Sequence, residues 1–398
     1  MHVFEVSVSS IGYHYLAELE SFPIRLVRQL FSCIMVRVDA SNRLEIVMST
    51  IDRLATGIRG HVNRFSHVVI NVSDLERSVE FYEKTLPVQR VTRINGPRQD
   101  YQGLDIAGGK FDGWVLENKK DTAPPGEFIA EFPPRLIHLI EWKTPTPIGE
   151  PYREANHVGI YRQNALVNNL DAAYANVLAN EGRPYAEPSS IVLTPNDFSV
   201  VVFAYRDPDG STLEMIAVDD PKGESDYPGM MHHCNLNVTN LEKSYKFYRD
   251  VIGLDLTVYL APDKLQPVSN GSLGDCLRNP DGMLYAGEGM QFAATLMGVR
   301  SDSRNPIDVL QWGVPAPYGS PYEAANCLGI IRVGLEVDDI DAAHARLKLA
   351  GLSGIGPIET WDMGDFGERK VVIFKDPDGI MLELIEHIPI PTDRPPFE

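Results

Sequence analysis

Four side chains able to bind a metal ion stand at the start or end of short apolar segments in the first half of the sequence. They are His67, Glu141, His157 and Glu214. Taken singly, each has an ordinary explanation, because alternate positions of a strand face solvent. A carboxylate inside an apolar strand is costly to desolvate, however, unless it meets a cation or hydrogen-bond donors. The order His, Glu, His, Glu therefore predicts a nitrogen and oxygen site for one divalent ion: Zn²⁺, Fe²⁺, Ni²⁺ or Mn²⁺.

A second set of candidate ligands occupies matching positions in the second half. Its members are His233, Gln311, Cys327 and Glu383. Gln311 stands where the first half has Glu141, and Cys327 stands where it has His157. An isolated cysteine in such a place is usually a small buried apolar residue. The second set therefore predicts a degenerate site whose metal binding is open.

An internal repeat relates these two sets. Residues 67–82 recur as 233–248, Trp142 recurs as Trp312, and the Asp-Pro-Asp-Gly turn at 207–210 recurs at 376–379. Three anchors in one order at nearly constant spacing indicate two homologous halves. The predicted organisation is an N-terminal extension without a motif over residues 1–64, domains over 65–220 and 229–390, and a C-terminal tail over 391–398.

Each half divides again into two units that begin with a strand followed by a helix. Ser73-Asp-Leu-Glu76 is a capping box, in which the Ser hydroxyl and the Glu carboxylate bond to backbone N–H groups at a helix start. Residues 75, 79 and 82 then form one apolar helical face. Asp-Pro-Asp-Gly between apolar runs predicts a turn between antiparallel strands. The chain is therefore expected to contain four units, each made of a strand, a helix and several strands.

Composition excludes several classes of function. The 398 residues include 36 Lys plus Arg and 55 Asp plus Glu, which gives a formal net charge of −19. This balance disfavours binding to nucleic acid or to an anionic membrane surface. No apolar run approaches the roughly 20 residues needed to span a bilayer. Four cysteines without C-x-x-C spacing, and a start without a basic region, favour a cytoplasmic protein.

The segments 67–82 and 207–214 resemble the vicinal oxygen chelate superfamily, which includes glyoxalase I, methylmalonyl-CoA epimerase, bleomycin-resistance proteins and extradiol ring-cleaving dioxygenases. The resemblance covers about residues 65–390. It implies an α+β fold of four βαβββ modules, which pair into two curved, cup-shaped mixed β-sheets with flanking helices. It also implies that His67, Glu141, His157 and Glu214 hold the metal, and that Glu214 is the general base.

Two ways of pairing the modules remain open. If module 1 pairs with 2 and module 3 with 4, the complete site contains the four residues just named. If module 1 pairs with 4 and module 2 with 3, the complete site becomes His157, Glu214, His233 and Gln311. Sequential pairing is preferred, because its connectors are short and consecutive units usually pack together.

Three functions fit this resemblance. The first is a glyoxalase-like lyase or isomerase whose metal binds two adjacent oxygens of a small substrate. The second is an Fe(II) extradiol dioxygenase acting on a catechol, although the second half lacks the catalytic His and Tyr that this class implies. The third is a ligand-binding or resistance protein without catalysis. For each function, the protein is expected to be a monomer or a homodimer. Substrate-binding residues are not identified, but the Gly- and Asp-rich segment 96–132 is a candidate lining of the cup.

Overall fold

The computed structural model describes residues 35–38, 44–47, 57–97, 106–119, 136–193, 198–218, 230–260, 266–267, 291–299 and 302–387. The chain forms two units, Met1–Gly57 and Ile58–Glu398. In the first unit, β1 (Met35–Val38) pairs with β2 (Leu44–Val47) in antiparallel fashion. The second unit contains every candidate ligand. The predicted tail over 391–398 lies outside the described residues.

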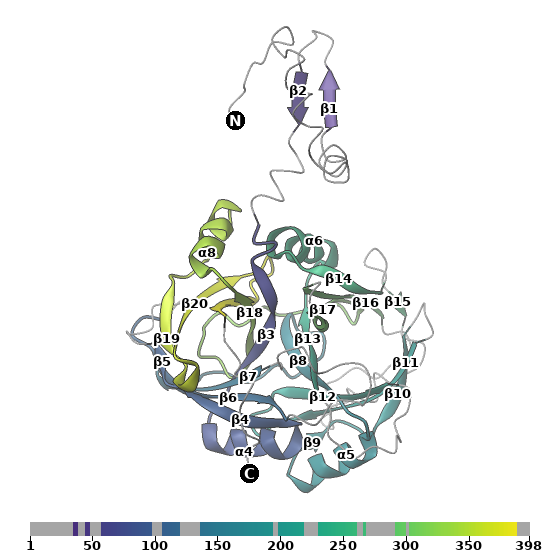
Figure 1. Ribbon diagram of the computed structural model, residues 1–398. Helices are drawn as coiled ribbons and strands as arrows, with labels where there is room; N and C mark the ends of the chain where they lie inside the picture. Colours follow the sequence, from purple (N-terminus) through teal and green to yellow (C-terminus); the bar gives the residue numbers. More distant parts are fainter. Residues whose placement is uncertain are drawn as a thin grey trace, which may run out of the picture. The chain divides into compact units, whose positions relative to one another are not determined.

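The second unit is built from four βαβββ modules (Figure 1). Module 1 contains β3 (Val62–Asn71), α4 (Leu75–Thr85), β4 (Val88–Ile94), β5 (Gly96–Pro97), β6 (Lys110–Asn118) and β7 (Leu136–Thr144). Module 2 contains β8 (Gly159–Leu166), α5 (Leu170–Ala179), β9 (Arg183–Pro184), β10 (Ser189–Leu193), β11 (Phe198–Arg206) and β12 (Thr212–Val218). Module 3 contains β13 (Met230–Asn237), α6 (Leu241–Lys246), the π-helix η3 (Phe247–Ile252), β14 (Asp255–Leu260), β15 (Gln266–Pro267), β16 (Gln291–Val299) and β17 (Asp302–Val314). Module 4 contains β18 (Gly329–Val337), α8 (Ile340–Leu349), β19 (Glu359–Asp362), the 3₁₀ turn η4 (Gly364–Phe366), β20 (Glu368–Lys375) and β21 (Met381–Glu386). The α+β prediction is confirmed.

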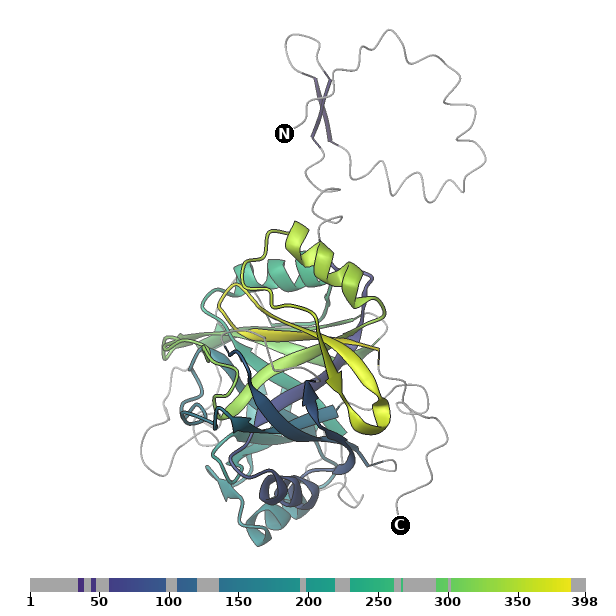
Figure 2. The same cartoon turned by 90° about the vertical axis from the view of Figure 1, so that its left-hand side faces the viewer.

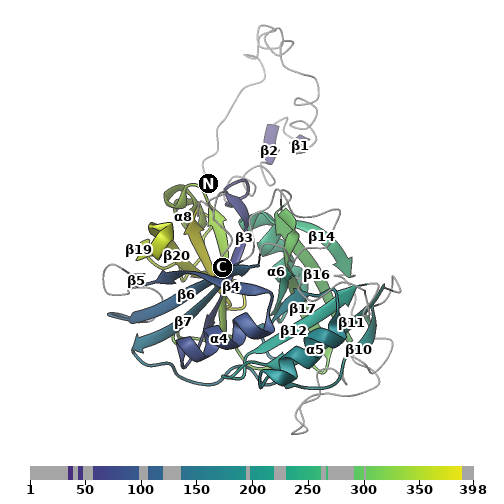
Figure 3. The same cartoon turned by 60° about the horizontal axis from the view of Figure 1, so that its bottom comes forward.

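Module 1 pairs with module 4, and module 2 pairs with module 3. The first sheet has the strand order β4-β6-β7-β3-β18-β21-β20-β19-β5, and the second has the order β10-β11-β12-β8-β13-β17-β16-β14. Figure 3 displays the two sheets, and in Figure 2 the yellow strands of module 4 lie next to the blue strands of module 1. The preferred sequential pairing is therefore wrong.

The connectors between modules explain how this exchange is accommodated. The segment after β7 runs from the first sheet to the second, and the segment after β17 runs back. The two connectors hydrogen-bond to each other: the Ile148 N–H donates to the Asn326 carbonyl at 3.0 Å, and the Val158 N–H donates to the Tyr318 carbonyl at 2.9 Å. Their backbone groups are thus satisfied while they cross between sheets.

The first sheet curls until it is nearly closed. Strands β4 and β5 form its two ends, yet only Asn95 separates them in the chain. The inside is filled by apolar side chains that include Phe111, Trp142, Trp361 and Met363. This enclosed interior gives polar groups on its inner face a dry environment. Phe111 comes from the segment 96–132, of which residues 98–105 and 120–132 lie outside the described chain.

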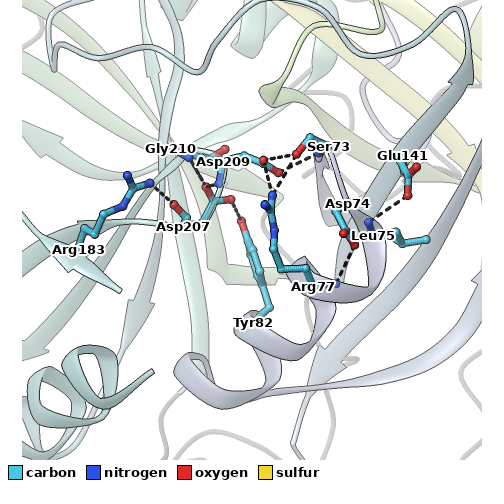
Figure 4. Close-up of polar contacts among 11 residues, drawn as sticks. Ser73, Asp74, Leu75, Arg77, Tyr82, Glu141, Arg183, Asp207, Asp209 and Gly210 are labelled. Carbon is cyan, nitrogen blue, oxygen red and sulfur yellow. Dashed lines mark hydrogen bonds and ion pairs between the residues drawn. The ribbon is translucent and has the colours of Figure 1, made fainter. Parts of the chain in front are cut away.

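The helix starts differ from the predicted capping box by one residue. Asp74, not Ser73, caps α4, because its carboxylate accepts the Arg77 N–H at 3.1 Å. Ser73 instead bonds to Asp209 of module 2, through its N–H at 2.9 Å and its hydroxyl at 2.5 Å (Figure 4). The repeated motif therefore joins one module to the next as well as starting a helix.

The Asp-Pro-Asp-Gly turns anchor the helices of the preceding modules. The Asp207 carboxylate accepts the N–H groups of Gly210 and Ser211, each at 2.7 Å, and the buried Tyr82 hydroxyl at 2.9 Å (Figure 4). Tyr248 and Asp376 repeat this contact at 2.9 Å. Modules 1 and 2, and likewise modules 3 and 4, thus pack helix against turn between the two sheets.

Replacing Tyr82 by Phe is expected to lower the free energy of unfolding by about 1–3 kcal/mol, because the buried Asp207 carboxylate loses a hydrogen-bond donor. Urea unfolding of the variant measures this loss. Tyr248→Phe is the matched variant in the other half, since the Tyr248 hydroxyl makes the same contact with Asp376. Unchanged stability in both variants would show that these hydroxyls do not stabilise the fold.

Candidate metal centre

Glu141 and Gln311 bind helix starts rather than a shared metal site. An oxygen of Glu141 accepts the Leu75 N–H at 3.0 Å, at the first residue of α4 (Figure 4). Gln311 Oε1 accepts the Leu241 N–H at 2.8 Å, at the first residue of α6. Each side chain therefore satisfies an N–H group that has no partner within its helix. Both residues were predicted as ligands.

His157 and Cys327 lie in the connectors, before their strands begin. The His157 ring stacks on Tyr152 with centroids 4.0 Å apart, and its Nδ1 lies 2.8 Å from the Val158 carbonyl oxygen. Cys327 is half-buried and forms an isolated β-bridge with Ile148. Burial raises the pKa of its thiol. Neither side chain belongs to the cluster formed by the strands.

The predicted set does not converge, because its members belong to different sheets. His67 lies on β3 of the first sheet, and Glu214 lies on β12 of the second. The alternative set is not brought together either: His157 lies in a connector against Tyr152, and Gln311 contacts the start of α6. The pairing of modules 1 and 4 instead brings Glu383 to His67.

Three buried side chains meet on the inner face of the first sheet: His67 from β3, His138 from β7 and Glu383 from β21, here called the triad. His67 Nε2 lies 3.0 Å from Glu383 Oε1. The rings of His67 and His138 stack with centroids 3.8 Å apart. One ligand atom from each residue lies within 4.8 Å of the other two. Within the described residues, this is the cluster of His, Cys, Asp and Glu whose ligand atoms approach closely enough for one ion.

Gly334 makes room for the His67 ring. A Cβ at this position would lie 1.9 Å from His67 Cε1. Gly334 is the register partner of both His67 on β3 and Glu383 on β21. A side chain here would therefore push the imidazole out of the triad.

Burial and neighbouring charges shift the pKa values of two triad residues, which disfavours the ionised form of His138 and favours that of Glu383. Burial lowers the pKa of His138 well below its usual value, and the neighbouring His67 lowers it further, so the ring is neutral. Burial alone would raise the pKa of Glu383, but Arg332 and His67 together lower it to about 2. Glu383 is therefore a carboxylate, and Arg332 Nε donates to its Oε2 at 2.6 Å.

The triad has the composition that a divalent metal requires. Both ring nitrogens of His138 are buried and have no hydrogen-bond partner. An unpaired buried nitrogen is unfavourable unless another group binds it. Ser66 Oγ lies 2.8 Å from His67 Nδ1, a contact that orients a ligating imidazole and leaves its other nitrogen for the ion. Two imidazoles and one carboxylate thus fit a single divalent ion.

The second sheet carries a counterpart of different chemistry. Arg162, Glu214 and Asp308 occupy the positions of Arg332, Glu383 and His138. Arg162 Nε lies 3.3 Å from Glu214 Oε2, and Asn235 Nδ2 donates to Asp308. All of these side chains are buried.

His233 is the counterpart of His67 in the second half. Its Nδ1 lies 2.7 Å from His232 Nδ1. Asn164 occupies the register position that Gly334 has in the first sheet, and its side chain donates to the His233 carbonyl at 3.1 Å. Gly334 thus leaves room for the His67 ring, whereas the matching position of the second sheet carries the side chain of Asn164.

Two important residues of the cluster, His138 and Arg332, were missed from sequence. A signal for both existed in the repeat, because residues 138 and 332 each match a polar residue 170 positions away, Asp308 and Arg162. When a polar residue occupies the same position of an apolar strand in both halves of the chain, it indicates a side chain on the inner face of the sheet with a role in the site. The chosen residue in β7, Glu141, lies three positions beyond His138 and so faces the other side of the sheet.

A sequence model of the Glyoxalase/Bleomycin resistance protein/Dioxygenase superfamily matches residues 64–215 and 230–384. The chain belongs to this superfamily. A probable lactoylglutathione lyase of Vibrio cholerae is 30% identical over 162 residues, covering 39% of this chain and 88% of the relative. A probable chloroplastic lactoylglutathione lyase of Arabidopsis thaliana is 22% identical over 367 residues, covering 92% and 83%.

Solved structures agree with the superfamily fold. Glyoxalase I from Zea mays superposes with a TM-score of 0.51 at 16% identity, covering 81% of this chain and 92% of that one. An enzyme of lyase or dioxygenase type fits these comparisons, as the sequence predicted. In the part of this chain that the structure describes, no helix is long and apolar enough to cross a membrane. The cytoplasmic location and the oligomeric state stay predictions, and one relative is named as chloroplastic.

Asp308→Asn is expected to remove a pH dependence of folding stability. Burial raises the pKa of Asp308 to about 7, Glu214 raises it and Arg162 opposes the shift. Because this value exceeds the usual 3.8, Asp308 contributes stability below about pH 4 that is lost as the pH rises through about 7. As the pH rises between these limits, the free energy of unfolding of the wild type should fall by on the order of 3 kcal/mol relative to that of the variant. Urea unfolding from pH 4 to 8 measures the difference, and a constant difference would contradict the expectation.

Proposed function

We propose that this superfamily member is a metal-dependent enzyme in which His67, His138 and Glu383 hold one divalent ion, and in which the ion binds a small substrate through two adjacent oxygens. The observation that carries the proposal is the buried, neutral His138 ring, whose two nitrogens have no partner. It stacks on a second imidazole that touches a carboxylate. A structural histidine would normally hydrogen-bond with at least one ring nitrogen.

A bound divalent ion would act as a Lewis acid on the substrate oxygens. The protein residues prepare the site for this role. Arg332 keeps Glu383 ionised and fixes one of its oxygens, and Ser66 orients His67. The apolar side chains inside the first sheet exclude water, which strengthens electrostatic interactions at the site.

The relatives support a glyoxalase-type lyase or isomerase as the first candidate reaction. The relatives named above are called lactoylglutathione lyases, and one of them aligns with 92% of this chain. In this reaction, Glu383 takes the position that was predicted for the general base Glu214. Glu383 would have to part from Arg332 to accept a proton, because a carboxyl group with a pKa of about 2 is a weak base.

The donor set favours a second candidate, an Fe(II) dioxygenase. Two histidines and one carboxylate with open positions are the ligands of non-haem Fe(II) oxygenases. This reaction needs no proton transfer by Glu383, so the strong Arg332 contact is compatible with it. The absence of the catalytic His and Tyr that were expected in the second half counts against a ring-cleaving enzyme of the extradiol kind.

Metal reconstitution distinguishes these reactions. The purified protein is stripped of metal and loaded anaerobically with Fe²⁺, Zn²⁺, Ni²⁺ or Mn²⁺, and lactoylglutathione turnover and O₂ uptake with a catechol are measured. Turnover without O₂ uptake supports the lyase, and O₂ uptake with Fe²⁺ alone supports the dioxygenase. Failure of every ion to bind at a stoichiometry near one would refute the metal site.

A further inference from the structure

The guanidinium of Arg332 is only partly used by the protein. The side chain is 1% exposed and lies on β18, between β3 and β21. Its Nε donates to Glu383 Oε2 at 2.6 Å. Nη1 and Nη2 are both buried and have no hydrogen-bond partner. The guanidinium carbon lies 5.5 Å from the centroid of the Trp361 ring. The contacts with Glu383 and Trp361 thus hold the Arg332 guanidinium in place, while the N–H groups of its two terminal nitrogens, here called the fork, have no acceptor.

The charge of the site requires an anion beside this fork. Arg332 and Glu383 form a buried ion pair and cancel each other's formal charge. A divalent ion on the triad would therefore leave an excess of positive charge in a dry interior, which is unfavourable without a counter-charge. The two terminal nitrogens of an arginine match the two oxygens of a carboxylate.

We propose that Arg332 binds the carboxylate of the substrate, and that the substrate is a small apolar acid with a second oxygen next to its carboxylate, such as a 2-oxo, 2-hydroxy or ortho-hydroxy aromatic acid. The inference rests on the proposed function: the second oxygen and one carboxylate oxygen would bind the ion, while the carboxylate would also accept hydrogen bonds from Arg332. An apolar body matches the apolar side chains around the site, among them Phe111, Trp142 and Trp361.

The second sheet offers a natural contrast. Arg162 stands at the matching position, but two carboxylates, Glu214 and Asp308, are its electrostatic partners. Glu214 balances the charge of Arg162 there, and no divalent ion is proposed on that sheet, so an anionic ligand is not required. Arg162→Met is therefore a matched control for Arg332→Met.

Salicylate and salicylamide test this assignment, because the two molecules share a ring and a hydroxyl and differ in the carboxylate. Calorimetry measures their binding to the full-length protein, metal-free and loaded with Zn²⁺. Salicylate should bind the Zn²⁺ form about 10²-fold more tightly than salicylamide, as expected for charge-assisted hydrogen bonds. Arg332→Met should abolish this preference, Arg332→Lys should keep part of it, and Arg162→Met should leave it unchanged.

The outcomes separate the inference from the proposed function. Equal binding of the two probes to Zn²⁺-loaded wild type would overturn the inference, and this comparison holds even if the Arg332 variants fail to fold. A preference that survives in Arg332→Met would overturn it as well. Failure of Zn²⁺ to bind, together with an Arg332-dependent preference for salicylate, would refute the metal site and support the carboxylate fork.

Discussion

His138→Gln is expected to reduce metal binding from about one ion per chain to almost none, whereas Glu141→Gln keeps it. The first change removes one of three ligands, and loss of even an outer partner of a metal ligand lowers affinity by about 10–100-fold. The second change leaves an amide oxygen that can still accept the Leu75 N–H. Metal content after dialysis against a limiting chelator measures both variants.

The same pair of variants separates two assignments of the ligand in β7. Glu141 was predicted to bind the metal, and its carboxylate instead contacts the start of α4. Glu141→Gln should therefore match the wild type in activity as well as in metal content. Loss of metal in Glu141→Gln with retention in His138→Gln would restore the sequence-based ligand set and remove the triad. Circular dichroism of both variants verifies that they are folded.

The module architecture could be predicted because it is encoded locally and repeated. Helix starts, the apolar helical face and the Asp-Pro-Asp-Gly turn recur at nearly constant spacing, and each has a local physical cause. The structure confirms the four βαβββ modules. It also gives the most recognisable residues a structural role, since Tyr82 and Asp207 hold a helix against a turn.

The ligand in β7 could not be chosen from local pattern. Residues 136–140 are all buried, so the alternation that usually separates an inner from an outer face is missing. His138 and Glu141 both look exceptional in this apolar strand, and a spacing of three places them on opposite faces. Only the neighbouring strands show that residue 138 shares a face with Glu383.

The pairing of modules was equally hidden, because it depends on contacts between distant segments. A connector of the same length permits either arrangement, and the pairs β3–β18 and β8–β13 join residues far apart in sequence. Glu383 consequently appeared as part of a degenerate site, although it completes the triad. The sequence likewise did not show that Gly334 and Asn164 lie beside Glu383 and Glu214, because this depends on the register of the paired strands.

Dividing the chain between residues 218 and 230 is expected to abolish metal binding by either half alone. His67 and His138 belong to the first half, whereas Arg332 and Glu383 belong to the second. The isolated first half would also expose β3 and β8, and the isolated second half would expose β13 and β18, because these strands pair with the other half. The two halves expressed together should co-purify and bind about one ion per pair. Size-exclusion chromatography followed by metal analysis measures both properties.

The divided protein tests the exchanged pairing directly. With sequential pairing, the first half would be self-sufficient and would carry His67, Glu141, His157 and Glu214 together. Metal binding by the first half alone would therefore contradict both the sheet order and the triad. A co-expressed pair carrying His138→Gln is the internal control, because it keeps both interfaces and loses one ligand. Association without metal in that pair, and with metal in the unmodified pair, would locate the ion on side chains contributed by both halves.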